Sequence, residues 1–253
     1  MIKGVTTMSL SQDEVTGLTP AVGWVIFDNP ARHNAMSLSL WQVAANKLLE
    51  YESDSSVKAV IMLGAGDKAF VSGADISEFD SVRDNAKQAQ QYSQVSSRAR
   101  EAMSSLTKPL IAMIRGYCLG AGVDIALPAD IRIASECSIF SIPAAKLGIA
   151  YGVDSVQMLT DLVGPSAAKD ILFTGRRVNA QEALQLGLVN QVVPAGELEA
   201  ATDRYTSTIV RNAPLTIKFA KFSVRQALLD TASQDLATAN RLISDCFDSA
   251  DYR

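Results

Sequence analysis

The sequence predicts an α/β fold, because apolar, β-rich runs alternate with segments of helical periodicity. Residues 22–28 carry apolar side chains on both faces of the run, which indicates a strand covered on both sides. Similar runs predict strands at about 57–63, 109–115, 130–134 and 188–193, with a short strand near 137–142. One face of a helix is marked by Leu38, Trp41, Ala45 and Leu48. Helices therefore separate the strands.

The last quarter of the chain changes character after Pro194, where strand signals end. Just before it, Asn179 and Glu182 have the spacing of a capping box, and Gly187 provides a stop, so a short helix is predicted at 180–186. Three amphipathic segments follow, at about 196–211, 214–230 and 232–248. We therefore predict an α/β core over residues 1–195 and a helical region over residues 196–253. The apolar side chains of that region suit either the protein's own core or a contact with another subunit.

Composition narrows the class of function. The net charge of −4 over 253 residues gives no long-range attraction to nucleic acid or to an anionic membrane, so we expect a small-molecule partner. The three cysteines lack a C-x-x-C spacing and His33 is the single histidine, so no metal site is predicted. No apolar run has the length of a membrane span or the form of a signal peptide. We expect a cytoplasmic protein.

Two glycine-bearing turns, at 70–76 and 116–124, are the main chemical signal. Each follows an apolar run and leads into a helix start, so each can direct backbone N–H groups at one external oxygen. Two such donors form an oxyanion hole, which stabilises the negative charge that develops on a thioester or ester carbonyl. The turns therefore indicate carbonyl chemistry.

The residues around these turns resemble the crotonase superfamily, the enoyl-CoA hydratase and isomerase family. The resemblance is carried by the following groups: Asn29-Pro30 with Asn34-Ala35, Lys68-Ala69-Phe70 with Gly73-Ala74-Asp75-Ile76, Lys108-Pro109, Gly116-Tyr117, Leu119-Gly120 and Ala129-Asp130-Ile131-Arg132-Ile133-Ala134. It continues through Leu147-Gly148, Leu172-Phe173-Thr174-Gly175 and Gly187-Leu188-Val189 to Val192-Val193-Pro194, and so covers nearly the whole chain.

This resemblance implies a spiral core of repeated ββα turns, followed by C-terminal helices that build a trimer, often paired into a hexamer. It implies an acyl-CoA substrate and no separate cofactor, since coenzyme A is part of the substrate. The oxyanion-hole donors fall on the backbone N–H groups of Ala74 and Ala121. The coenzyme A path is lined by Ala74, Asp75, Ile76, Ser77 and Ala121.

The sequence departs from a hydratase of this family, which uses two glutamates. Asp124 stands at the first of these positions and Ala144 at the second, so one carboxylate is shorter and the other is missing. Two neighbours are candidates for the missing group. Tyr151 resembles a tyrosine in the equivalent loop of a decarboxylase of the superfamily. Asp154 is closer to a helix N-cap than to the acids of other branches.

Three functions follow from these residues. The first is an enzyme that acts on an acyl-CoA thioester through a stabilised enolate, with Asp124 as acid or base and weak hydration because of Ala144. The second is an acyl-CoA decarboxylase or double-bond isomerase that uses Tyr151. The third is a catalytically silent acyl-CoA-binding protein. Cys118, inside the second turn, has no histidine beside it and is predicted to be a buried packing residue.

Overall fold

The computed structural model describes residues 21–78 and 86–253, and its strands form two sheets. The larger sheet has five strands in the order β1-β2-β4-β6-β9, with every neighbouring pair parallel. Its strands are β1 (Val22–Phe27), β2 (Ala59–Gly64), β4 (Leu110–Ile114), β6 (Ile131–Ser135) and β9 (Gln191–Val193). The strands predicted from the apolar runs are confirmed, with small shifts at their ends.

The second sheet has four short strands in the order β3-β5-β7-β8. They are β3 (Ala69–Val71), β5 (Tyr117–Leu119), β7 (Ile139–Ser141) and β8 (Val178–Asn179). β3, β5 and β7 pair in parallel, and β8 is antiparallel to β7. In three successive stretches a long strand is followed by a short strand and then by helix, which is the predicted ββα repeat. β3, β5 and β8 were not predicted, because so few residues show no alternation of apolar and polar side chains.

Eight α-helices are present in the described residues. They are α1 (Leu38–Ser53), α3 (Ala86–Ser105), α4 (Ala121–Ala126), α5 (Val153–Thr174), α6 (Ala180–Gln185), α7 (Leu198–Arg211), α8 (Pro214–Ala227) and α9 (Leu236–Phe247). α5 is interrupted at Gly164, where φ is +77° and Pro165 follows. The Asn179 side chain accepts from the N–H of Glu182 at 2.9 Å, so the predicted cap of α6 is confirmed.

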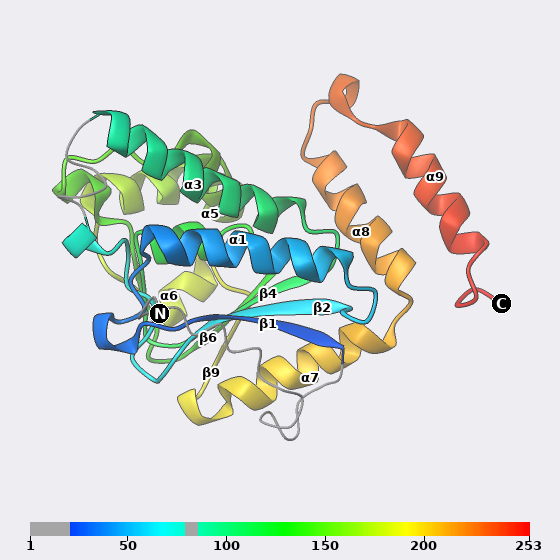
Figure 1. Cartoon of the computed structure of the whole chain (residues 1–253), viewed down its shortest axis with the longest axis horizontal. Helices are drawn as coiled ribbons and strands as arrows, with labels where there is room; N and C mark the ends of the chain where they lie inside the picture. The colour runs from blue at the N-terminus through cyan, green and yellow to red at the C-terminus, as the bar shows by residue number, and fades with distance from the viewer. Residues whose placement is uncertain (1–20, 79–85) are drawn as a thin grey trace.

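Both faces of the larger sheet are covered, as expected for a parallel sheet (Figure 1). α1 and α3 pack together over one face, where Val60 and Met62 of β2 join the main core. α7 covers the other face, where Ile61 and Ile111 pack with Leu198. Alternate residues of the central strands therefore serve two apolar cores, which fixes the sheet between two helical layers.

The C-terminal helices α8 and α9 extend away from the sheets (Figure 1). Large apolar side chains remain exposed on these helices and at the C-cap of α8, among them Val224, Leu228, Leu236 and Phe247. α7 differs, because its Leu198 and Ala201 are buried against the sheet. The division of the chain at residue 195 stays a prediction. Among the helices of residues 21–78 and 86–253, none combines the length and the apolar character that crossing a membrane requires.

Candidate active site

The two glycine-bearing turns lie side by side. β3 and β5 pair in parallel, so their carboxyl ends carry both turns to the same edge of the small sheet. The register shifts between Ala69 and Val71, where two steps along β3 match one step along β5, from Tyr117 to Cys118. A Cβ atom added to Gly120 would lie 3.9 Å from the Cα of Gly73. Two glycines 47 positions apart in the sequence are thus close neighbours.

The first turn leaves the N–H group of Ala74 available. Met36 bridges this turn: its N–H donates to the Gly73 carbonyl at 2.8 Å, and its carbonyl accepts from the N–H of Asp75 at 2.9 Å. In a parallel bridge, the residue between these two bonds directs its own N–H to the opposite side. Within the described residues, the Ala74 N–H has no hydrogen-bond acceptor. Gly73 has φ of +127°, which places this turn in a conformation that favours glycine.

The second turn ends in a helix rather than continuing from the long strand. The expected strand over 109–115 stops at Ile114, and the separate short strand β5 carries the chain to Gly120. The Gly120 N–H donates to the Ser141 carbonyl at 2.8 Å, with φ of +50° at Gly120. Ala121 is the first residue of α4, and the first N–H groups of a helix have no acceptor inside it. Ala121 therefore presents a donor beside the Gly73 turn.

Asp124 projects from α4 into a mostly buried setting, with its side chain 12% exposed. Arg100 of α3 places Nη1 2.9 Å from Asp124 Oδ2, and the Ser155 hydroxyl of α5 donates to Oδ1. Burial raises the pKa of Asp124, while the Arg100 charge and the hydrogen bond from Ser155 lower it and Asp154 raises it. Three helices thus contribute to the surroundings of one carboxylate.

Tyr151 contacts the second turn. Its hydroxyl donates to the Gly120 carbonyl at 3.3 Å, and its ring packs against the main core. Burial raises the pKa of Tyr151 well above its ordinary value, and the nearby Asp124 charge adds to this rise. The phenol therefore stays protonated at neutral pH.

Ala144 lies in the 3-10 helix Pro143–Lys146, which follows β7. A Cβ atom added to Gly120 would lie 4.0 Å from the Cδ of Pro143, so this segment adjoins the second turn. The Ala144 methyl group is partly buried against the main core and carries no proton to exchange. Ala144, the position where the resemblance predicts a second carboxylate, is therefore an apolar residue in a segment next to the turn.

The preference for Asp154 as a helix N-cap is wrong. α5 begins at Val153, and its N-cap is Gly152, whose extended backbone has φ of −63° and ψ of 142°. The Gly152 carbonyl accepts from the N–H of Val156 at 3.0 Å, which places Asp154 inside the first turn. A glycine without a side-chain acceptor is a weak sequence signal for a helix start, so the nearby aspartate was favoured instead.

The residues predicted along the coenzyme A path differ in their surroundings. The Asp75 carboxylate lies 2.8 Å from Arg32 Nη1, so it pairs with a cation from another loop. Ile76 is 73% exposed at the start of the 3-10 helix Ile76–Glu78. Ser77 belongs to the same helix, and its side chain lies outside the described residues. Cys118 is fully buried and burial raises the pKa of its thiol, so it is a packing residue as predicted.

Arg100 and Ser155 were missed by the sequence analysis. Arg100 lies in a polar helical stretch, and nothing in its neighbourhood marks it as different from other surface arginines. Ser155 follows Asp124 by 31 residues, and Arg100 precedes it by 24. Only the packing of α3, α4 and α5 brings the three side chains together, so no spacing rule could have found them.

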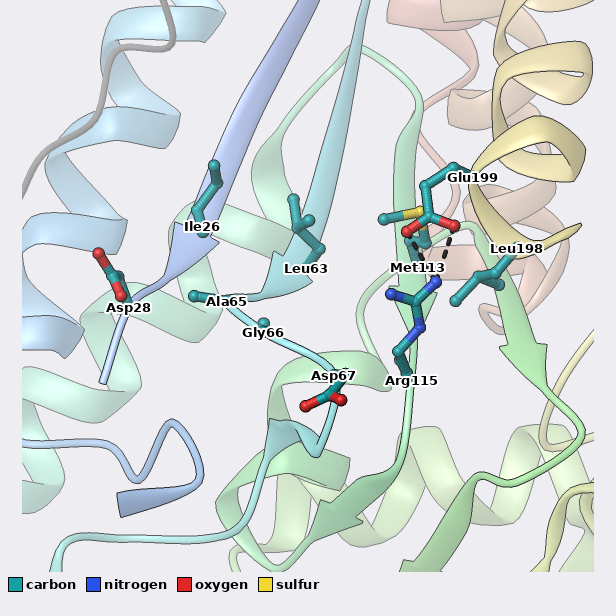
Figure 2. A pocket seen from close by; sticks show the side chains of 11 residues that line it. Ile26, Asp28, Leu63, Ala65, Gly66, Asp67, Met113, Arg115, Leu198 and Glu199 are labelled. Atoms are coloured by element: carbon teal, nitrogen blue, oxygen red, sulfur yellow. Dashed lines mark hydrogen bonds and ion pairs between the residues drawn. The ribbon is translucent and has the colours of Figure 1, made fainter. Parts of the chain in front are cut away.

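A cavity of about 530 Å³ lies elsewhere, at the carboxyl ends of β1, β2 and β4. Figure 2 shows Arg115 and Glu199 pointing toward one another at one side of this cavity. Arg115 Nη2 lies 2.7 Å from both carboxylate oxygens of Glu199, while the Arg115 Nε is buried without a partner within the described chain. Asp28 and Asp67 also line it. None of its lining residues is a predicted site residue.

Comparisons with known proteins match nearly the whole chain to one family. The profile of the enoyl-CoA hydratase/isomerase family matches residues 18–253. A short-chain-enoyl-CoA hydratase of Clostridium acetobutylicum is 35% identical over 232 residues, covering 92% of this chain and 88% of that protein. A crotonyl-CoA hydratase of Syntrophomonas wolfei is 29% identical over 226 residues, covering 89% of this chain and 86% of that protein.

Solved structures show the same similarity over most of the chain. The crystal structure of an enoyl-CoA hydratase/carnithine racemase from Magnetospirillum magneticum matches with a TM-score of 0.86 at 32% identity, covering 92% of this chain and 87% of that one. The enoyl-CoA hydratase from Bacillus anthracis matches with a TM-score of 0.82 at 31% identity, covering 93% and 89%. The predicted crotonase-like fold is thereby confirmed.

Proposed function

Because the chain belongs to the enoyl-CoA hydratase/isomerase family of the crotonase superfamily, we propose that it acts on an acyl-CoA thioester through an enolate held between its two glycine turns. The observation that carries this proposal is the contact between the Gly73 and Gly120 turns. That contact supports the assignment of the two donors as the N–H of Ala74 and the first N–H of α4, at Ala121. Two donors of this kind are suited to one thioester oxygen. No separate cofactor is required, because coenzyme A enters with the substrate.

Asp124 is the acid or base of the proposed reaction. When its carboxylate takes a proton from the α-carbon, the C–H electron pair forms a carbon–carbon double bond and the carbonyl electrons move to oxygen. The N–H groups of Ala74 and Ala121 stabilise the resulting oxyanion. Each oxygen of an ionised carboxylate has two acceptor positions, so the hydrogen bonds from Arg100 and Ser155 leave room for this proton.

Ala144 makes efficient hydration by two carboxylates unexpected, because its methyl group cannot give or take a proton. The test is to measure binding of crotonyl-CoA by calorimetry and its hydration by absorbance. We expect binding with slow hydration. Failure to bind crotonyl-CoA, butyryl-CoA or free coenzyme A would refute the acyl-CoA proposal, and hydration as fast as that of a two-glutamate hydratase would refute the role assigned to Ala144.

A second candidate reaction is supported by Tyr151, whose buried phenol lies beside the Gly120 turn. In a malonyl-type thioester, loss of carbon dioxide breaks a carbon–carbon bond and leaves its electron pair in the enolate. The Tyr151 hydroxyl would then donate its proton to the α-carbon, and the phenolate would regain a proton from solvent. In a double-bond shift, the Asp124 carboxylate would take a proton from one carbon and the Tyr151 hydroxyl would donate its own proton to another, after which the proton held by Asp124 would pass to the phenolate. Mass spectrometry of products from malonyl-CoA, methylmalonyl-CoA and 3-enoyl-CoA thioesters tests these reactions.

The binding and turnover assays, repeated on one variant, distinguish an enzyme from a catalytically silent binding protein. Asp124→Asn should strongly lower turnover while leaving acyl-CoA binding intact if Asp124 transfers protons. Binding without turnover in both the wild type and this variant would instead support a silent protein.

The exposed side chains of α8 and α9 support a homotrimer or hexamer. Leu228 is 67% exposed and Phe247 is 56% exposed, and apolar faces of this kind are typical of subunit contacts. Light scattering after gel filtration gives the subunit number. A monomer at micromolar concentration would contradict this assignment.

A further inference from the structure

The Asp124 carboxylate is held at both oxygens by partners from two different helices. Arg100 of α3 contacts Oδ2 at 2.9 Å, and the Ser155 hydroxyl of α5 contacts Oδ1. The Arg100 side chain is 19% exposed, and Ser155 is 3% exposed. Because the two oxygens have separate partners, rotation about the last side-chain bond of Asp124 would break both contacts.

The charged groups near Asp124 have opposite effects on its pKa. Arg100 on α3 is the cation in direct contact, and Asp154 on α5 is an anion that acts at longer range. Tyr151, in the loop before α5, and Cys118, on β5, are neutral, because burial raises the pKa of each. Burial of Asp124 favours its protonated form, so Arg100 is the main group that favours the ionised carboxylate.

We propose that Arg100 and Ser155 are positioning residues that hold Asp124 in one orientation and in its ionised form, so that this carboxylate serves as the base of the site. This inference rests on the proposed function, in which Asp124 removes the α-proton. An aspartate is one methylene shorter than the glutamate found in hydratases of the family, so its reach depends on a fixed orientation. The two contacts fix the directions of the remaining lone pairs.

Exchange of the α-hydrogens of butyryl-CoA in deuterated water provides the test, because it reports enolate formation without further chemistry. Mass spectrometry measures the exchange rate from pH 4 to pH 9. A base works when it is ionised, so the rate rises through its pKa and then reaches a plateau. Loss of a contacting cation raises the pKa of a carboxyl by about one to three units. Arg100→Met should therefore shift the rising limb to higher pH by about one unit or more.

Matched variants separate positioning from a general loss of structure. Ser155→Ala should shift the limb in the same direction by a smaller amount, and Arg100→Lys should restore most of the wild-type profile. Arg98→Met changes an exposed arginine on the same helix and should leave the profile unchanged. An Arg100→Met variant with an unmoved limb and a uniformly lower rate would overturn the proposal, because that result describes a structural role alone.

Failure of the proposed function gives a different result. Exchange that persists in Asp124→Asn would show that another group is the base, whatever Arg100 does. If the wild type shows no measurable exchange, the ionisation of the Asp124 carboxyl is followed directly instead. Infrared difference spectra between the wild type and Asp124→Asn provide this measurement. Arg100→Lys and Ser155→Ala serve this measurement if Arg100→Met does not fold. An Asp124 titration that neither variant moves would overturn the proposal.

Discussion

Two arginine–carboxylate pairs of nearly equal length lie in contrasting parts of the molecule. Arg100 and Asp124 are 2.9 Å apart with side chains 19% and 12% exposed, beside the two glycine turns. Arg115 and Glu199 are 2.7 Å apart with side chains 24% and 50% exposed, in the cavity of Figure 2. Water screens the second pair and hydrates its carboxylate, whereas the first depends on protein partners. The distance between two charged groups therefore does not by itself determine how much their interaction affects stability or activity. The burial of the pair has a larger influence.

The largest difference between the pairs is expected in turnover. Asp124→Asn should lower the rate of butyryl-CoA hydrogen exchange by about 10²- to 10⁴-fold, the usual contribution of a general base. Glu199→Gln is the matched control and should leave the rate unchanged. Equal rates for the two variants would remove the distinction between the two regions.

The backbone of the turn region gives the next largest effect. Gly120 has φ of +50°, so Gly120→Ala should lower the free energy of unfolding by about 1–3 kcal/mol, measured by urea denaturation. An added Cβ would make only ordinary van der Waals contacts, the nearest at 3.9 Å, so the cost comes from the backbone conformation. Gly196→Ala is the control, because nothing lies within 4 Å of its added Cβ, and its stability should not fall.

A carboxylate added to the turn region should have a moderate effect. Ala144→Glu supplies the group that a two-carboxylate hydratase requires, and we expect crotonyl-CoA hydration to increase about tenfold or more. Ala145→Glu places the same charge on an exposed neighbour and should not increase it. The absorbance assay compares both with the wild type. Identical rates for the two variants would show that the surroundings of Ala144 do not face the reacting carbons.

The smallest effect belongs to the open pair. Arg115→Met should lower the free energy of unfolding by no more than about 1 kcal/mol, because partly exposed pairs contribute little. Arg100→Met should be more destabilising, since it leaves a buried carboxylate without its cation. Urea denaturation at neutral pH measures both. A larger loss for Arg115→Met would contradict the comparison between the pairs.

The extent to which the sequence predicts this molecule depends on how local each feature is. The long strands were predictable, because runs such as residues 57–63 are apolar on both faces. β3 and β5 were not, since each has only three residues and is defined by pairing with the other. Asp124 was found through the family resemblance. The side chains of Arg100 and Ser155 come from helices whose packing no local pattern encodes.

The irregular register between β3 and β5 determines how the two turns are aligned, and this alignment tolerates no shift in strand pairing. One residue of an extended strand spans about 3.3 Å. Donor–acceptor distances in hydrogen bonds vary by only about 0.5 Å, so a shift of one residue moves a donor out of hydrogen-bond range. Phe70 is the extra residue of β3 in this pairing, and its ring is fully buried against Phe27. The packing of this ring therefore fixes how far one turn is offset from the other along the strands. A slip by a single residue would leave both loops intact and yet remove one donor from reach. The alignment of this site is thus set by a packed phenylalanine several residues before it.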